Sequence, residues 1–116
     1  MITCEIPFNK FLLKNNTKKI GKYGNFYISP EAKSAQYALI IDLKMACKGH
    51  TLRDKEKVWI NIFVEKPKNN IDCINLLDSI ADCIKQAIGI DDKYFCISQI
   101  DYEIKKDGVI KIVIEQ

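Results

Sequence analysis

The segment that decides the fold is residues 57–89, which read KVWINIFVEKPKNNIDCINLLDSIADCIKQAIG. In its first third, apolar side chains alternate along one face, and they are Val58, Ile60, Ile62 and Val64. This period of two predicts a strand over residues 57–65 with one well-buried side. In its second half, apolar residues recur at helical spacing, which predicts a helix over residues 72–88 that ends at Gly89.

The residues that precede this segment are expected to add a strand and a helix. Residues 1–6 are expected to form a short strand that Pro7 ends, and residues 9–24 a basic loop with five lysines. Ser29-Pro30-Glu31 is typical of a helix start, because it combines a capping hydroxyl, a proline at the first helical position and an early acid. This helix is expected to reach about Cys47, and Gly49 then closes it.

Two further strands are expected after the second helix, over residues 94–104 and 109–115. The dipeptide Asp107-Gly108 between them is a hairpin signal. The predicted order is strand–loop–helix–strand–helix–strand–strand, in one domain that spans residues 1–116. The predicted class is α+β, with a mixed, mostly antiparallel sheet on which two helices pack.

The composition is that of an ordered soluble domain, with 47% hydrophobic and 28% charged residues. No membrane span is expected, because no window approaches about 18 consecutive apolar residues, and the first residues do not resemble a signal peptide. The charge is uneven: residues 1–70 carry 13 Lys and Arg against six Asp and Glu, whereas residues 71–116 carry five against nine. This asymmetry suits a polyanion held near a metal-binding pocket, and simple solvation explains it equally well.

The five cysteines do not predict a zinc site, because no C-x-x-C pair exists and the only histidine is His50. Most of them are expected to be small buried hydrophobic residues. An odd number of cysteines without a secretion signal fits a reducing, cytoplasmic location.

The helix over 72–88 also carries a polar stripe. About 140° from the apolar stripe lie Asn75, Asp78 and Asp82. Asp72 lies at the helix start, and the pair Asp91-Asp92 follows the helix. Mg²⁺ prefers carboxylate and water oxygens, and metal-assisted phosphodiester hydrolysis uses such an ion to activate water and to stabilise the leaving oxygen. A solvated helix face with Asp72 as a simple cap explains the same pattern.

Residues 72–84 (DCINLLDSIADCI), followed by Gly89-Ile90-Asp91-Asp92, resemble the RusA family of Holliday junction resolvases. That family carries D-x-D-N-L-x-K-x-x-x-D-x-L and then a D-D pair. Ile6-Pro7, Asn9, the basic loop and residues 27–33 (YISPEAK) are similar to the family's opening strand, loop and helix start. Lys66-Pro67-Lys68 stands where the family has a basic turn. The resemblance covers nearly the whole chain in the same order.

The resemblance implies a homodimer that binds four-way DNA junctions and cuts them as an endonuclease with Mg²⁺ or Mn²⁺. Asp72, Asn75, Asp82 and Asp91-Asp92 occupy motif positions. Two departures from the motif matter: Ile74 replaces its second Asp, and Asp78 replaces its Lys. We expect Asp78 to take the ligand role that Ile74 vacates. The expected catalytic residues are Asp72, Asp78 and Asp92, and the expected metal ligands are Asp72, Asp78, Asp91 and Asp92.

The alternative hypothesis is a non-catalytic DNA-binding protein of the same fold, in which Ile74 marks the lost ligand. A small interaction module without any role on nucleic acid is a third hypothesis.

A helix over 72–88 is about 24 Å long. Asp72 and Asp92 can therefore share one ion only if the helix is shorter, the chain folds back, or a second copy completes the site.

DNA contact is expected from the basic half, because lysine binds phosphates largely without regard to sequence. The expected contact residues are Lys10, Lys14, Lys18, Lys19, Lys22, Lys66, Lys68 and Asn75. Tyr23, Phe26 or Tyr27 could wedge between bases at a junction, although such aromatic residues more often pack at a strand end.

Overall fold

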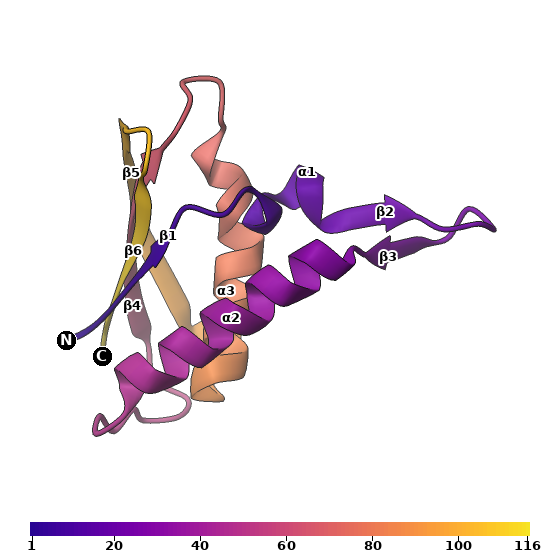
Figure 1. Cartoon of the computed structure of the whole chain (residues 1–116). Coiled ribbons are helices and arrows are strands. Elements are labelled where there is room, and N and C mark those ends of the chain that lie inside the picture. The colour runs from indigo at the N-terminus through magenta and orange to yellow at the C-terminus, as the bar shows by residue number, and fades with distance from the viewer.

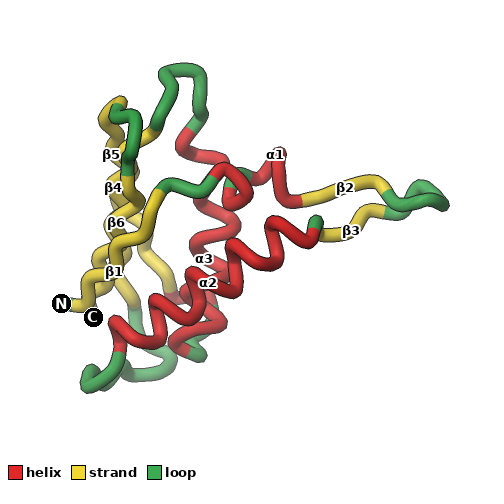
Figure 2. The backbone as a smooth tube through the Cα atoms, in the orientation of Figure 1, coloured by secondary structure: helices red, strands yellow, loops and turns green.

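The structure, a computed structural model, describes the backbone of all 116 residues and every side chain except those of Asn15, Thr17 and Lys18. One layer is a four-stranded open sheet with the order β1-β6-β4-β5, in which only the β4–β5 pair is parallel. Its strands are β1 (Ile2–Pro7), β4 (Val58–Lys66), β5 (Phe95–Ile104) and β6 (Val109–Glu115). Helices α2 (Pro30–Cys47) and α3 (Leu77–Ile88) cover one face of this sheet (Figures 1 and 2). The predicted α+β class with a mostly antiparallel sheet and two helices is confirmed.

The core lies between the sheet and the two helices. The alternation read from residues 57–65 is confirmed, since Val58, Ile60, Ile62 and Val64 are all buried. Against them pack the buried leucines and isoleucines of the neighbouring elements, which include Leu39, Leu43, Ile80, Ile84, Ile110, Ile112 and Ile114. On the opposite face of β4, Trp59 and Phe63 stay exposed. The sheet is therefore a half-covered layer with its apolar side toward the helices.

The start of α2 and the end of α3 are as their terminal residues predict. The Ser29 hydroxyl accepts a hydrogen bond from the Ala32 backbone N–H at 3.1 Å, and Pro30 is the first residue of α2. Gly89 ends α3 in the left-handed conformation at φ 72°, where a residue with a Cβ is strained. The helix predicted from residue 72 begins instead as a 3₁₀ turn over Cys73–Leu76, and α3 proper starts at Leu77.

The predicted hairpin between the last two strands is wrong. β5 pairs with β4 alone, and β6 lies between β4 and β1, antiparallel to both. The chain therefore crosses the end of β4 between β5 and β6, where the Lys105 N–H donates to the Lys66 carbonyl at 2.9 Å. Gly108 is required there, because a Cβ would lie 2.0 Å from the Glu65 carbonyl oxygen. The physical reason for the order is burial: β6 is apolar and takes a central place, whereas the polar β5 takes an edge.

The predicted loop over residues 9–24 is wrong for most of its length. It contains a 3₁₀ turn (Lys10–Leu12), one helical turn α1 (Lys14–Thr17) and strand β2 (Lys18–Ile20). β2 pairs antiparallel with β3 (Phe26–Ile28), and this hairpin projects away from the sheet and from α3 (Figure 1). Strands of three residues are too short to show a reliable period of two, so the composition indicated only a loop. Among the described residues, no helix is long and apolar enough to cross a membrane.

Candidate functional site

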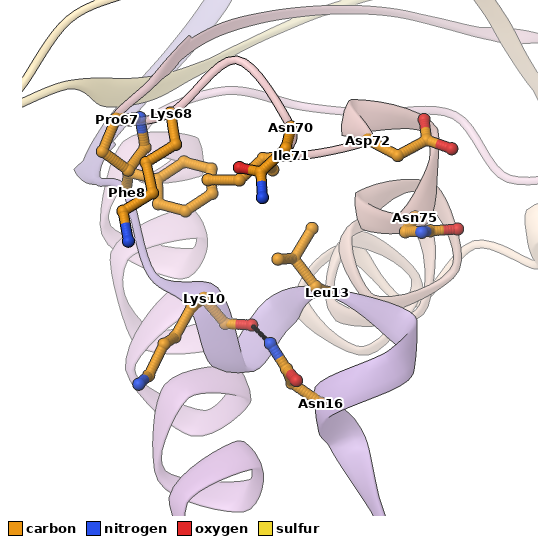
Figure 3. Close-up of a pocket in the computed structure, with 10 residues that line it drawn as sticks. All are labelled: Phe8, Lys10, Leu13, Asn16, Pro67, Lys68, Asn70, Ile71, Asp72 and Asn75. Carbon is orange, nitrogen blue, oxygen red and sulfur yellow. Dashed lines mark hydrogen bonds between the residues drawn. The ribbon is translucent and has the colours of Figure 1, made fainter.

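A cleft of about 680 Å³ brings together several residues that the sequence singles out. One wall is the segment that follows β1, with Lys10 and Asn16, and the other is the turn and 3₁₀ segment after β4. In Figure 3, Lys10 and Asn16 of the first wall lie below Lys68 and Asp72 of the second wall. The cleft thus combines two lysines, side-chain amides and one carboxylate, which are groups that bind phosphate oxygens or bases.

The N-terminal wall is held by contacts on both sides of the Lys10–Leu12 turn. The Asn9 side chain accepts a hydrogen bond from the Phe11 N–H at 3.0 Å and caps the turn. Leu12 and Leu13 are buried and tie the segment to the core. The Asn16 side-chain amide donates to the Lys10 carbonyl at 3.0 Å (Figure 3). The Lys10 ammonium group remains at the surface, where solvent and ligands can reach it.

The opposite wall depends on Lys66, which was expected to contact DNA. This residue is 5% exposed, and the alternation of β4 places it on the same side of the sheet as Val64. Its ammonium group donates to the carbonyls of Asn69 at 3.1 Å and Ile71 at 2.9 Å, and it lies 3.8 Å from the centre of the Tyr102 ring. The structure therefore places Lys66 inside the turn, where it organises the cleft wall, and leaves Lys68 exposed at the cleft.

The first motif positions lie on this wall. The Asp72 carboxylate accepts a hydrogen bond from the Ile74 N–H at 3.2 Å and caps the 3₁₀ turn. Asp72 itself is exposed. Asn75 lines the cleft beside it. Ile74 does not line this cleft. It is 62% exposed and borders a separate shallow groove along β5.

The acidic residues of α3 have other partners. The Asp78 carboxylate is ion-paired with the Lys14 ammonium at 3.2 Å, which links the first turn of α3 to α1. The Asp82 carboxylate accepts a hydrogen bond from the Gln86 side chain at 2.9 Å, one helical turn later. Neither Asp78 nor Asp82 lines the cleft. The pair predicted as a polar stripe is thus a solvated face of α3 that contributes one contact to the N-terminal segment.

Asp91 and Asp92 lie beyond the other end of α3. The Asp91 carboxylate caps the 3₁₀ turn over Asp92–Tyr94 by accepting a hydrogen bond from the Lys93 N–H at 3.1 Å. That backbone hydrogen bond is the main reason why the pKa of Asp91 is lowered, with a smaller contribution from the Asp92 side chain. Both residues are exposed, so their oxygens are accessible to a ligand.

The expected metal ligands are not brought together within one chain. Asp72 and Asp78 lie near the N-terminal end of α3, whereas Asp91 and Asp92 follow its C-terminal end. A helix of 12 residues is about 18 Å long, far more than one ion can bridge. In the described part of the chain, no three Asp, Glu, His or Cys residues are grouped so that they could hold a metal ion. These carboxylates therefore do not fit a divalent cation inside a single copy of the chain.

The remaining lysines that were expected to contact DNA belong to the projecting hairpin. Lys19 is ion-paired with Glu31 of α2 at 3.7 Å. Lys22 lies at the hairpin turn, with its ammonium 5.9 Å from the centre of the Tyr23 ring. Lys18 begins β2, and its side chain lies outside the described residues. Lys19 and Lys22 are exposed on the hairpin and do not line the cleft.

The cleft also contains residues that sequence reasoning did not select, among them Phe8, Leu13, Asn16 and Asn70. The basic turn over residues 66–70 was a usable signal for Asn70. No local pattern pointed to Phe8 or Asn16, because they reach the cleft only through the packing of the N-terminal segment on α3 and the β4 turn.

The prediction that most cysteines are buried is confirmed for Cys4, Cys73 and Cys83, whereas Cys47 and Cys96 are partly exposed.

In comparisons with known proteins, no family model matches the chain, and no curated protein is significantly similar to it.

Proposed function

We propose that this protein binds branched DNA, with the cleft between the N-terminal segment and the β4 turn as its main contact with the phosphate backbone. The observation that carries the proposal is the composition of this cleft, where Lys10 and Lys68 stand with Asn16, Asn70 and Asn75 around an open volume. Ammonium and amide groups on one concave surface suit phosphate and sugar contacts that do not depend on sequence.

The charge distribution supports a polyanionic ligand. Residues 6–30 contain five lysines and no Asp or Glu, and this segment forms both the cleft wall and the hairpin. A surface of one sign raises the local concentration of an oppositely charged ligand and speeds its association. DNA binding here is therefore expected to weaken steeply as salt increases.

A binding experiment tests the cleft directly. The affinity of a labelled four-way junction is measured against salt for the wild type, for the double variant Lys10→Ala/Lys68→Ala and for the control Lys44→Ala, which removes an exposed lysine of α2 outside the cleft. The double variant is expected to reduce the salt slope by about 2, because each phosphate contact contributes about 1. An unchanged slope in the double variant, or an equal loss in Lys44→Ala, would contradict the proposal.

For the reaction, we propose metal-dependent cleavage of the junction by a homodimer, as the RusA resemblance implies. The carboxylates of one chain do not meet, so the proposal needs Asp72 of one copy beside Asp91 and Asp92 of a second copy. Two-fold symmetry would then form two equal sites. Exposed carboxylates at both ends of α3 support this arrangement, because they are available to a second copy.

Cleavage of a synthetic junction with Mg²⁺, with Mn²⁺ and with chelator tests this reaction. Asp72→Asn and Asp92→Asn are each expected to abolish the paired nicks. When the two inactive variants are mixed, a shared site restores cutting, because one of the two sites in the mixed dimer keeps both Asp72 and Asp92. Failure of the mixture to cut would contradict the proposal of a site shared between two copies.

The second candidate is a non-catalytic junction-binding protein of the same fold. Two observations favour it: Ile74 stands in place of the second motif Asp, and Asp78 is engaged by Lys14. This candidate predicts salt-dependent binding without cutting in either metal. Ile74→Asp is a sharp test of the cause, since Ile74 is exposed and its replacement leaves the core intact. Cleavage gained by this variant would show that the lost ligand explains the inactivity.

A further inference from the structure

The β2–β3 hairpin projects from the packed body and carries exposed apolar side chains. It extends beyond the N-terminal end of α2, away from the sheet (Figure 1). Its exposed residues include Ile20 at 68%, Tyr23 at 89% and Phe26 at 71%. Single exposed apolar residues are common, but three of them on a six-residue ribbon and its turn form a continuous surface that needs an explanation.

The strand register gathers the apolar residues on one face of the ribbon. Ile20 lies directly opposite Phe26, so their side chains form a cross-strand pair. Ile28 lies on the same face, two residues farther along β3, while Lys19 and Tyr27 form the pair on the other face. Ile28 is paired in register with Lys18, so this face carries apolar residues at three of its four positions, whereas the other face carries Lys19 and Tyr27.

The hairpin is held at a defined angle to the body. Lys19 is ion-paired with Glu31 in the first turn of α2, and the buried Ser29 connects β3 directly to the helix cap. At the tip, the Gly21 N–H donates to the Asn25 carbonyl at 2.6 Å, and Gly24 adopts φ 79°. The tip contacts shape the turn, and the Ser29 cap together with the exposed Lys19–Glu31 pair joins the base of the hairpin to α2.

The charge of the hairpin favours a partner that carries negative charge. No Asp or Glu occurs between Glu5 and Glu31, while Lys19 and Lys22 flank the apolar face and the turn. A partner must therefore offer flat apolar surfaces beside negative charge. Nucleobases beside phosphates have this combination, and aromatic side chains stack on unpaired bases without regard to sequence.

We infer that the β2–β3 hairpin is a second DNA contact, which places Phe26 and its neighbour Ile20 against unstacked bases at the branch point while Lys22 at the turn binds a flanking phosphate. This inference rests on the proposed DNA binding and deepens it, because it explains how a branched molecule is distinguished from a continuous duplex. Only the branch point offers bases that unstack at low cost. The cleft supplies general affinity, and the hairpin supplies selectivity for structure.

The test uses the whole protein and a four-way junction that carries aminopurine at the branch point, with chelator present to prevent cutting. Aminopurine is an adenine analogue whose fluorescence rises when it unstacks. A continuous duplex with the same label is the reference substrate. The variants are Phe26→Ala, Phe26→Tyr, which keeps a ring, and Tyr37→Ala, which removes an exposed aromatic residue from α2. Anisotropy measures the binding of each variant to both DNA molecules.

The wild type, Phe26→Tyr and Tyr37→Ala are expected to raise the fluorescence of the junction several-fold and to leave the duplex unchanged. Phe26→Ala is expected to lose this rise and to bind the junction about tenfold more weakly, with duplex affinity within about twofold of the wild type. Junction binding by the wild type without a rise, or an undiminished rise in Phe26→Ala, would overturn the inference while the proposed DNA binding stands. Absence of binding to either DNA would overturn both. A loss of self-association in Phe26→Ala without any effect on fluorescence would instead assign the hairpin to a second copy of the chain.

Discussion

The body and the N-terminal arm of this molecule differ in how far their side chains are buried. The body, made of the four-stranded sheet with α2 and α3, buries the apolar side chains of β4 and β6 that face the helices, while Trp59 and Phe63 on the other face of β4 stay exposed. The N-terminal arm, residues 8–28, is less buried. It attaches through Leu12 and Leu13 and then extends as a hairpin whose side chains are mostly exposed.

This difference indicates that the body supplies most of the stability of the fold, whereas the arm offers most of the charged surface for a ligand. Burial of apolar area supplies most of the free energy of folding, and the arm beyond Leu13 contributes little of it. The arm is also the most basic part of the chain, with five lysines and no acid between residues 6 and 30. Substitutions in the body should therefore change stability, whereas substitutions in the arm should mainly change ligand binding.

The largest expected effect comes from Gly108→Ala in the body. The new methyl group would lie 2.0 Å from the Glu65 carbonyl oxygen, so β6 or the end of β4 must move. A loss of about 4 kcal/mol or more in the free energy of unfolding is expected. Urea denaturation followed by circular dichroism measures it. Gly24→Ala at the tip of the arm is the control: its φ of 79° disfavours alanine, but nothing lies within 4 Å of the new group. A loss near 1 kcal/mol is expected there.

Truncation of a buried and of an exposed apolar residue gives the next contrast. Ile62→Ala removes a fully buried side chain from the centre of β4 and should cost about 3 kcal/mol. Phe26→Ala removes a larger side chain from the arm and should change stability by less than about 0.5 kcal/mol. The same urea experiment applies to both. Equal losses would mean that the hairpin face is packed in solution, which would break the distinction between body and arm.

Two lysines close in sequence should separate structural from ligand-binding roles. Lys66→Ala leaves the carbonyls of Asn69 and Ile71 without their donor, so a loss of about 2 kcal/mol in stability is expected. Lys68→Ala should leave stability within about 0.5 kcal/mol and should weaken DNA binding at low salt. Thermal unfolding and anisotropy, measured on both variants, give the two quantities. A stable Lys66→Ala protein would show that the turn does not depend on this buried ammonium group.

The smallest perturbation concerns the thiols, since no residue is changed. Burial raises the pKa of Cys83 to about 12, with a smaller contribution from Asp82, and it raises that of Cys4 to about 11. Because the thiolate is the reactive form, both cysteines should resist an aromatic disulfide reagent at about pH 8 until the protein unfolds. Cys96, which is partly exposed, should react in the native state. Mass spectrometry of the labelled peptides identifies each site, and rapid labelling of Cys83 would indicate that the packing of α3 opens.

Much of the body could be predicted from the sequence because its signals are local. The alternation in β4, the Ser29-Pro30 start of α2 and the Gly89 end of α3 each depend on a few neighbouring residues, and all three are present in the structure. The site was less predictable. Of the residues singled out, Lys10, Lys68, Asp72 and Asn75 share the cleft, whereas Asp78, Asp91 and Asp92 lie elsewhere.

The sequence by itself determined the α+β class, the two helices, the strand over β4 and a basic N-terminal half, since these follow from periodicity, caps and charge. Only the tertiary structure decided that β6 enters between β1 and β4, that Lys66 is buried while Lys68 is exposed, and that the carboxylates separate along α3. The physical reason is that strand order and side-chain environment depend on contacts between residues far apart in the chain. Ile110 is adjacent to Val64 because both bury apolar surface under the helices, and no local pattern encodes that pairing.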